Sequence, residues 1–449
     1  MVAKIKIAFL QAKTSPIFLI ILLAFFVKVF LSNLVFHVDI LSQAAWGQWI
    51  FDHGPLGFYN FEIWIYSWPN YPPLGSLFFG FDRWLYWQIL EFFRFLTFNV
   101  VPHTAPGHMV WWFDFIKWFD IQKYDVTILK TGFLMTIKLP LILADLALAV
   151  VSYYLAKSQH IKYPLIWPLL FLLSPFSFYL SSFWGQSDNL DFLLVLVSFL
   201  LLYQRKIFFS IILLSLALHF KPTAVVFLPF FLWLLIKQKT QLWQLGLGII
   251  ASLVMTYLII VPFTNLDVVT FTKTYLFPKV VHRAEFRLST NSFNFWHILI
   301  GNKAFGQDYI FLFLPAKLWG YGIFALINLF AFKLLNKVTL ENIFKAMFLV
   351  SFSGWLFLTN MLERYEYAAI ASLFFLTIYR PRFIKYFLIL SLIFWVNLYH
   401  GWWFPQWLEP LRQVLIWQEG LIARLLSVIN VVLFFQIIKM FSITKVAEE

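Results

Sequence analysis

The sequence contains no cysteine, so disulfide bonds and thiolate chemistry are excluded and the redox compartment is left open. Charged residues are also scarce: they make up 12% of the 449 residues, whereas apolar residues make up 61%. A water-soluble fold with this composition would lack the polar surface needed to cover its core. The mean hydropathy of +0.79 agrees with this argument, and we predict an all-α integral membrane protein.

Motifs for metals and nucleotides are missing as well. The chain has no HExxH, no Cys/His cluster, no Gly-rich phosphate loop and no DxD within 37–128. We therefore predict no metal and no other cofactor. The net charge of +13 does not indicate nucleic acid, because no basic domain or arm carries it. Lysine and arginine lie between apolar runs, where they act as topology signals.

Apolar runs that approach the roughly 20 residues of a membrane-crossing helix recur along the whole chain. The three at 189–204, 207–220 and 223–236 are short, which is typical of helices that line a cavity. We predict about twelve spans in a single domain, 1–449. The spans are 16–36, 129–155, 162–181, 189–204, 207–220, 223–236, 241–262, 309–333, 343–361, 366–379, 384–400 and 420–439.

The basic residues predict the orientation. If the N-terminus is cytoplasmic, every inside segment is basic, as the positive-inside rule requires, and the C-terminus is cytoplasmic too. The opposite side then carries a first outer loop, 37–128, a second, 263–308, and a Trp-rich stretch at 399–420. Charges interrupt the apolar stretch 74–101, so we expect it to be an interfacial amphipathic helix. The inside cations are Lys4, Lys6, Lys13, Lys157, Lys162, Arg205, Lys206, Lys237, Lys239, Lys333, Lys337, Arg380, Arg382, Lys385, Lys439 and Lys445.

Asp39 lies just beyond the first span, in His37-Val38-Asp39. One interpretation is a helix N-cap at the start of 39–50, since Asp is a preferred capping residue. The other is a general base at the mouth of an apolar cavity, where partial burial raises the pKa and basicity of a carboxylate. Both interpretations stay open on the sequence.

Further polar residues gather on the predicted outer side. Gln186 and Asp188 offer mixed donors and acceptors suited to sugar hydroxyls, although a polar loop needs no function. Lys221 is basic against the charge rule, so it either snorkels to headgroups or holds a substrate phosphate. The remaining outer cations are His282, Arg283, Arg287 and Arg364, the last of which Glu363 or Glu366 can neutralise.

Inside the predicted spans, Lys28, Lys138 and Asp145 are costly unless they are paired. Lys138 and Asp145 are seven residues apart and share roughly one helix face. We expect a structural pairing between helices that includes Lys28.

Five segments, taken in order, share motifs with one known group of proteins. They are His37-Val38-Asp39 with Trp68-Pro69-Asn70-Tyr71-Pro72-Pro73-Leu74, Lys138-Leu139-Pro140 with Ala144-Asp145-Leu146, Ser174-Pro175 with Trp184-Gly185-Gln186-Ser187-Asp188, Leu276-Phe277-Pro278 with Arg287 and Asn291 to Trp296, and Leu362-Glu363-Arg364-Tyr365. Together they resemble the GT-C superfamily of membrane glycosyltransferases, which use polyprenyl- or dolichyl-phosphate sugars. The closest likeness is to lipid-linked-oligosaccharide glucosyltransferases and to bacterial and GPI-type mannosyltransferases. Leu362 stands where the family's HERY or HEK element has histidine.

The resemblance implies a GT-C fold, a polyprenyl-phosphate sugar as donor and a glycan, glycolipid or protein as acceptor. It implies that Asp39 is the catalytic base and that Lys221, Arg287, His282, Arg283 and Arg364 hold the donor phosphate. Gln186, Asp188, Tyr71 and Glu363 would bind the sugar or the acceptor. The expected location is a bacterial-type cell membrane.

A second class of function suits the helix count and the intramembrane charges: a twelve-helix secondary transporter or a lipid flippase. Transporters usually show two related halves. Here the long first outer loop has no counterpart near the middle of the chain, which disfavours that class.

Overall fold

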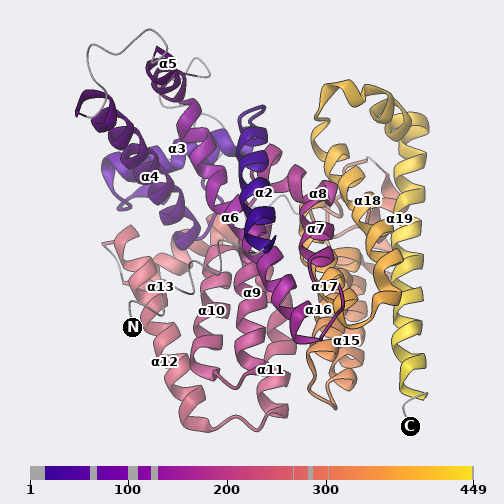
Figure 1. Cartoon of the computed structure of the whole chain (residues 1–449). Coiled ribbons are helices and arrows are strands. Elements are labelled where there is room, and N and C mark those ends of the chain that lie inside the picture. The colour runs from indigo at the N-terminus through magenta and orange to yellow at the C-terminus, as the bar shows by residue number, and fades with distance from the viewer. Residues whose placement is uncertain are drawn as a thin grey trace.

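The computed structural model describes residues 16–60, 68–99, 110–122, 130–265, 267–281, 287–301 and 303–446. Within these residues the fold is helical, and the strands β1 (Ile310–Phe311) and β2 (Leu314–Pro315) form one short antiparallel hairpin (Figure 1). Five of the described helices are long and apolar enough to cross a membrane, or six if a bent pair counts as one span. The prediction of an all-α membrane protein is confirmed at this level.

Every predicted span is wholly or mostly helical. The short segments are α9 (Asp188–Tyr203), α10 (Ile207–Phe220), and η4 (Pro222–Phe227) followed by α11 (Leu228–Lys237). The other helices up to α16 are α2 (Pro16–Ser32), α6 (Thr131–Ser158), α12 (Leu242–Ile260) with η5 (Val261–Phe263), α13 (Val268–Phe271), η6 (Thr272–Val281), α14 (Phe295–Ile300), α15 (Ala316–Leu334) and α16 (Leu340–Phe357). They are followed by η7 (Glu363–Glu366), α17 (Tyr367–Tyr379), η8 (Pro381–Phe383), α18 (Ile384–Trp402), η9 (Gln406–Leu408) and α19 (Glu409–Val446).

Two predicted spans differ in their details. The span 309–333 begins too early, because 310–315 form the β-hairpin and Leu312 has a left-handed φ of 59°, which a helix cannot continue through. The segment 162–181 is not one helix. It consists of α7 (Ile166–Leu172), then α8 (Pro175–Ser177) and η3 (Phe178–Trp184), with a bend of 56°. Pro175 lies at the break, where it cannot donate to the preceding turn.

The intramembrane charges are paired in a buried network. Lys28 Nζ on α2 is 2.8 Å from Asp145 Oδ2 on α6 and also donates to the hydroxyl groups of Ser177 and Ser181 on the broken segment. Asn189 at the start of α9 donates to the other oxygen of Asp145. The expected pairing of Lys28 and Asp145 is confirmed, and it fastens four segments to one another.

Lys138 has the expected structural role but a different partner, because its ammonium group bonds to backbone carbonyl groups rather than to a side chain. Its Nζ contacts the carbonyl oxygens of Ser32 and Val35 after α2, at 3.0 and 2.6 Å, and those of Ser182 and Phe183 in η3, at 2.8 and 2.9 Å. These carbonyl groups lie at the ends of helices, where they lack hydrogen-bond donors from the helix itself. Lys138 therefore holds the end of α2 beside the end of the broken helix.

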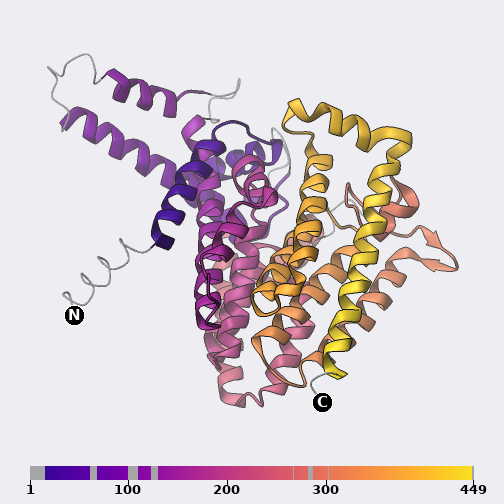
Figure 2. The same cartoon turned by 45° about the vertical axis from the view of Figure 1, so that its right-hand side comes forward.

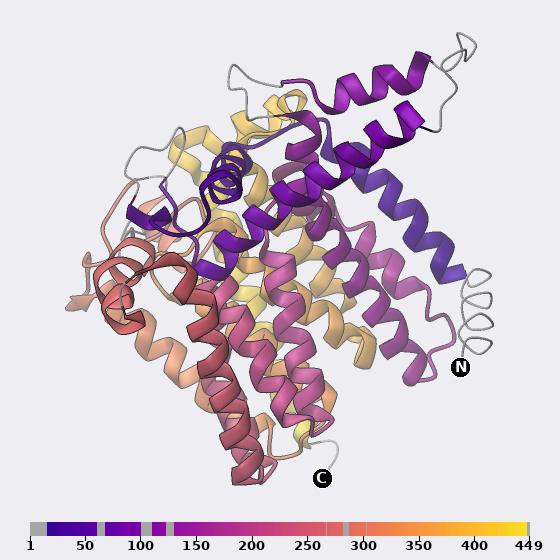
Figure 3. The same cartoon turned by 90° about the vertical axis from the view of Figure 1, so that its left-hand side faces the viewer.

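The first outer loop folds into helices at one end of the bundle. These are α3 (Val38–His53), the 3-10 turn η1 (Phe58–Asn60), α4 (Pro73–Asn99) and α5 (Val110–Phe119). The helix expected at 74–101 is confirmed as α4, which together with α5 projects sideways from the bundle (Figure 2). A view from another side shows α4 crossing above the helices α9 to α12 (Figure 3).

The connections lie at two opposite ends of the bundle. In Figure 1 the α11–α12 and α15–α16 connections lie at the lower end, together with the C-terminus, whereas α3, α4 and the α18–α19 connection lie at the upper end. The span predicted at 420–439 belongs to α19, whose backbone is non-helical from Trp417 to Gly420.

Candidate active site

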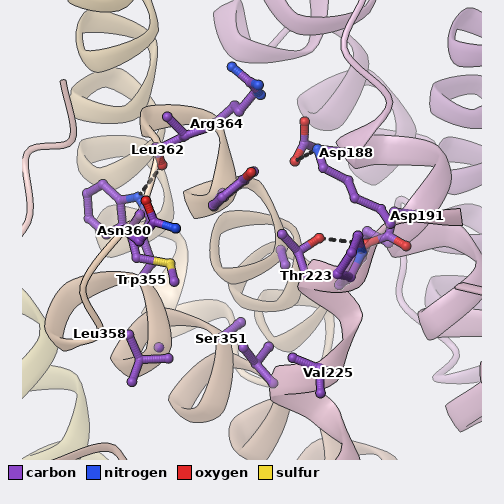
Figure 4. Close-up of a pocket in the computed structure, with 18 of the residues that line it drawn as sticks. Asp188, Asp191, Thr223, Val225, Ser351, Trp355, Leu358, Asn360, Leu362 and Arg364 are labelled. Carbon is purple, nitrogen blue, oxygen red and sulfur yellow. Dashed lines mark hydrogen bonds and ion pairs between the residues drawn. The ribbon is translucent and has the colours of Figure 1, made fainter. Parts of the chain in front are cut away.

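A cavity of about 660 Å³ lies between α9, η4, α16 and η7, under the loop that precedes α4 (Figure 4). Its two ends differ in chemistry. Asp188, Lys221 and Arg364 lie at one end, and apolar side chains including Val225 and Leu358 line the other. One cavity thus offers charged groups and an apolar surface to the same ligand.

Asp188 and Lys221 form a buried ion pair at the polar end. Lys221 Nζ is 2.5 Å from Asp188 Oδ1, and the two side chains are 6% and 7% exposed. Lys221 ends α10, where Pro222 starts the next turn, and its ammonium group lies 5.1 Å from the ring centre of Tyr365. Both residues, which the sequence placed on the predicted outer side, line the same cavity. The snorkelling interpretation of Lys221 is wrong, because the side chain points into the bundle.

Asp39 is held beside the end of the broken helix. Its Oδ2 accepts hydrogen bonds from Gln186 Nε2 at 2.6 Å and from Trp184 Nε1 at 3.3 Å. The helix begins one residue earlier than expected, and the N-cap is His37, whose Nδ1 accepts from the Asp39 N–H at 3.0 Å. The capping interpretation of Asp39 is therefore wrong. The carboxylate is free to turn towards Gln186.

The acidity of Asp39 is set by opposing neighbours. Burial of the carboxyl group raises its pKa, whereas the imidazole of His37 and the guanidinium of Arg364, whose Nη1 is 3.8 Å from Oδ2, lower it. The net effect holds the pKa of Asp39 below its ordinary value. The expected increase from partial burial is thus overturned, because the hydrogen bond with His37 and the charge of Arg364 together outweigh it. Asp39 is ionised at neutral pH.

Arg364 connects Asp39 with the cavity. Its guanidinium lies 3.3 Å from Glu363 Oε1 and 5.7 Å from the ring centre of Trp184. Burial lowers the pKa of Arg364, but the two carboxyl groups raise it above its ordinary value. Asp39 itself does not line the cavity, but Arg364 does. A ligand anion that binds Arg364 would therefore lie close to Asp39, because Arg364 contacts the Asp39 carboxylate.

Of the other predicted site residues, some line the cavity and some do not. Tyr71 lines the cavity, and burial raises its pKa to about 12, so its hydroxyl stays protonated. Gln186 and Glu363 are buried beside the cavity rather than in its lining, and burial raises the pKa of Glu363. Arg287 is exposed outside the lining. His282 and Arg283 lie outside the described residues.

Several residues that shape the site were not predicted as site residues. Thr223 donates to Asp191, and both line the cavity. Trp184 and Trp402 place their rings 4.9 and 4.8 Å from that of His37. Asp191 could have been predicted, because it lies three positions after Asp188 and the two residues share one face of a helix. The ring contacts of His37 join segments that are distant in the chain, so no local sequence pattern indicates them.

Known proteins do not identify this chain. No family model matches it, and no curated protein matches it. In the described part of the chain, no group of three or more His, Asp or Glu side chains is placed to hold a metal ion. The GT-C resemblance and the independence of metal both stay predictions.

Proposed function

We propose that this chain is an inverting glycosyltransferase of the GT-C type. It would move a hexose, mannose or glucose, from a polyprenyl-phosphate donor to an acceptor hydroxyl at the outer face of the membrane. One observation carries the proposal: Arg364 and Lys221, which is paired with Asp188, lie at one end of a cavity whose other end is lined mainly by apolar side chains (Figure 4). Such a cavity suits a ligand with a charged head and a hydrocarbon tail.

The proposed chemistry uses groups that are already close together. Asp39 accepts the proton of the acceptor hydroxyl, and the oxygen attacks the anomeric carbon on the face opposite the phosphate. The bond between that carbon and the phosphate oxygen breaks, and the configuration inverts. The phosphate leaves as a monoester dianion, which Lys221 and Arg364 stabilise by charge-assisted hydrogen bonds.

Binding of the donor would also change the partners of both cations. The carboxyl groups of Asp188, Asp39 and Glu363 are the present partners of Lys221 and Arg364. A phosphate that draws Arg364 towards itself weakens the contact with Asp39. The carboxylate then becomes a stronger base at the moment when the donor is in place.

The apolar end is suited to the polyprenyl chain. Val225 and Leu358 line it, and the side chains of Val226 and Leu358 both approach Gly354 (Figure 4). These residues come from η4 and the end of α16, which belong to the bundle. A lipid donor would reach the site from within the bilayer, in agreement with a fold that consists of apolar helices.

Twelve spans with both termini cytoplasmic complete the proposal. The connections with Lys237, Lys239, Lys333 and Lys337 lie at the end of the bundle opposite to α3 (Figure 1). Basic connections mark the cytoplasmic side, so α3 and Asp39 would lie on the outer side.

The test is an incubation of the purified protein with a panel of polyprenyl-phosphate hexoses and pentoses and candidate acceptors, scored for release of free polyprenyl phosphate. We expect release with at least one hexose donor. No release with any member of the panel would contradict the proposal. Accumulation of intact sugar or lipid across the bilayer of proteoliposomes, without release, would favour the transporter or flippase alternative.

A further inference from the structure

Large apolar side chains occupy the tip of the β-hairpin that precedes α15. The strands β1 and β2 are joined by a two-residue turn, Leu312-Phe313. These two side chains are 73% and 71% exposed. Tight turns usually carry small or polar residues, which suit a position in water. The tip is therefore an apolar surface that the helices of the bundle leave uncovered.

The backbone of this turn has a conformation that leucine rarely adopts. Leu312 has a φ of 59°, and a two-residue hairpin turn usually has glycine, asparagine or aspartate at such a position. A Cβ atom crowds the left-handed conformation, so a leucine there destabilises the turn relative to glycine. Glycine or asparagine would form the same turn with less strain and a more favourable contact with water. The folding of the hairpin alone therefore does not explain why Leu312 and Phe313 are present.

The tip is held in a fixed direction by contacts with α15. Trp319, near the start of this helix, donates from its Nε1 to the carbonyl oxygen of Phe311 at 3.0 Å. The ring of Trp319 also lies 5.2 Å from the ring of Phe313. In Figure 2 the hairpin projects sideways from the bundle, on the side opposite to α4 and α5. The apolar tip thus points outwards from the protein.

The hairpin lies at the end of a helix that is able to cross a membrane. α15 begins directly after β2 and is long and apolar enough for a span. The stretch 309–316 has no charge, and the residues on either side of it, Asp308 and Lys317, form an ion pair at 2.5 Å. Exposed apolar side chains continue along α15, at Leu318, Tyr321, Leu326 and Leu329. The surface that α15 presents to lipid therefore extends onto the hairpin.

We propose that the hairpin tip is a membrane-docking surface, whose Leu312 and Phe313 side chains insert into the leaflet at which α15 begins. The backbone limits the depth of insertion. A two-stranded hairpin has two edges with unpaired backbone groups, which hydrocarbon cannot satisfy. The strands therefore lie among the lipid headgroups, and the tip alone reaches the acyl chains. This inference does not depend on glycosyl transfer.

The experiment uses single cysteines labelled with bimane, because the natural chain contains no cysteine. Leu312→Cys and Phe313→Cys place the fluorophore at the tip. Gln406→Cys is the control, since this residue is exposed in the α18–α19 connection at the upper end of the bundle (Figure 1). The full-length protein is reconstituted into phosphatidylcholine vesicles with or without bromine atoms on the acyl chains, which quench bimane on contact.

We expect both tip positions to lose emission in the brominated vesicles. The loss should be greater with bromine near the headgroup end of the acyl chain than with bromine near its terminus, because interfacial groups penetrate only the boundary between headgroups and chains. The control should keep its emission. Iodide in the water should quench the control more strongly than the tip.

Two outcomes would overturn the proposal. Iodide quenching of the tip as strong as that of Gln406→Cys would mean that the tip lies in water. Shielding from both iodide and brominated lipid would mean that another protein molecule covers it. Leu312→Cys decides the test by itself if Phe313→Cys, which loses the ring contact with Trp319, does not fold. A wild-type thermal unfolding temperature identifies the labelled proteins that are folded.

Discussion

Asp39 combines two properties: its pKa lies below the ordinary value, and it lies 3.8 Å from Arg364, a cation that a substrate anion can attract away. The contacts with Gln186 and Trp184 fix one carboxylate oxygen. Arg364 is close enough to set the acidity of the group. The chemistry of the site therefore depends on a few contacts between segments that are distant in the chain, and substitutions of single residues can separate them.

Asp39→Asn should abolish most transfer without loss of folded protein. An asparagine keeps an oxygen that can accept from Gln186, but it cannot take up the hydroxyl proton. Loss of general-base catalysis typically costs on the order of 10²–10⁴ in rate. The measurement is kcat for transfer, together with the thermal unfolding temperature of the purified variant.

Asp52→Asn is the matched control, because Asp52 lies on the same helix α3 with an exposed side chain. It should turn over at nearly the wild-type rate. Normal turnover in Asp39→Asn together with a loss in Asp52→Asn would move the base to Asp52.

Arg364→Gln should change the pH dependence of transfer. The base works when ionised, so the rate is constant above its pKa and falls as the pH drops through it. Arg364 holds the pKa of Asp39 below its ordinary value, and without the guanidinium the raising effect of burial is less opposed. The acidic limb of kcat/KM should therefore shift to higher pH. The readout is its midpoint, which is independent of any loss in absolute rate.

Arg382→Gln removes a cation from the exposed turn before α18 and should leave the midpoint where it is. An unchanged midpoint in Arg364→Gln would mean that this arginine does not control the acidity of the base.

The sequence predicted the candidate residues better than their contacts. Asp39, Asp188, Lys221 and Arg364 were predicted from their types and positions. The structure places the last three at one end of the cavity, with Asp39 beside Arg364. The capping residue could not be identified in this way, because Asp is a preferred cap whereas His37 caps through a ring nitrogen.

The helices show where a hydropathy pattern succeeds and where it fails. Continuous apolar runs predicted α10, α12 and α17 closely, since in a membrane the backbone of such a run must satisfy itself as a helix. The same pattern does not show where a helix breaks within an apolar run. It could not show the bend at Pro175, because most residues around it are as apolar as the rest of the span. The non-helical turn before Leu421 was easier to place, since it contains Gln418, Glu419 and Gly420 and the span was predicted to begin there.

Gly320→Ala tests how closely α15 and α16 approach. A Cβ atom at Gly320 would overlap with the carbonyl oxygen of Phe357 at the end of α16. Small residues allow such approaches between membrane helices, and overpacking costs about 1–3 kcal/mol. Thermal unfolding in one detergent should show Gly320→Ala to be less stable than the wild-type protein.

Gly322→Ala is the control from the same helix, because a Cβ there meets nothing within 4 Å. It should be unchanged or stabilised by up to about 1 kcal/mol, since alanine favours a helix more than glycine does. Equal effects of the two substitutions would contradict the close packing of α15 on α16.

At the scale of the whole molecule, the absence of cysteine makes the topology directly testable. Single cysteines at Ser158 and Thr339 should be labelled from the cytoplasmic side by an impermeant reagent, and one at Gln406 from the outer side. All three positions are exposed. Ser187 is too buried to serve as the outer site. Labelling of Gln406→Cys and Thr339→Cys from the same side would overturn the proposed orientation.

The length of α10 has a consequence for the lipids around it. Its 14 residues rise roughly 21 Å, whereas the hydrocarbon layer of a bilayer is about 30 Å thick. Phe208 and Phe209 are 37% and 59% exposed, and in a bilayer these side chains would face lipid. A hydrophobic stretch shorter than the layer causes local thinning.

Turnover should therefore depend on acyl-chain length. The rate should be measured in proteoliposomes made from phosphatidylcholines of increasing acyl-chain length. It should be highest in the thinner bilayers and fall as the mismatch at α10 grows. When the protein is in detergent, the rate should not depend on acyl-chain length. A flat profile would contradict this expectation. The thinned region forms a depression in the leaflet, and through it a phosphate headgroup crosses less hydrocarbon to reach Lys221 at the end of α10.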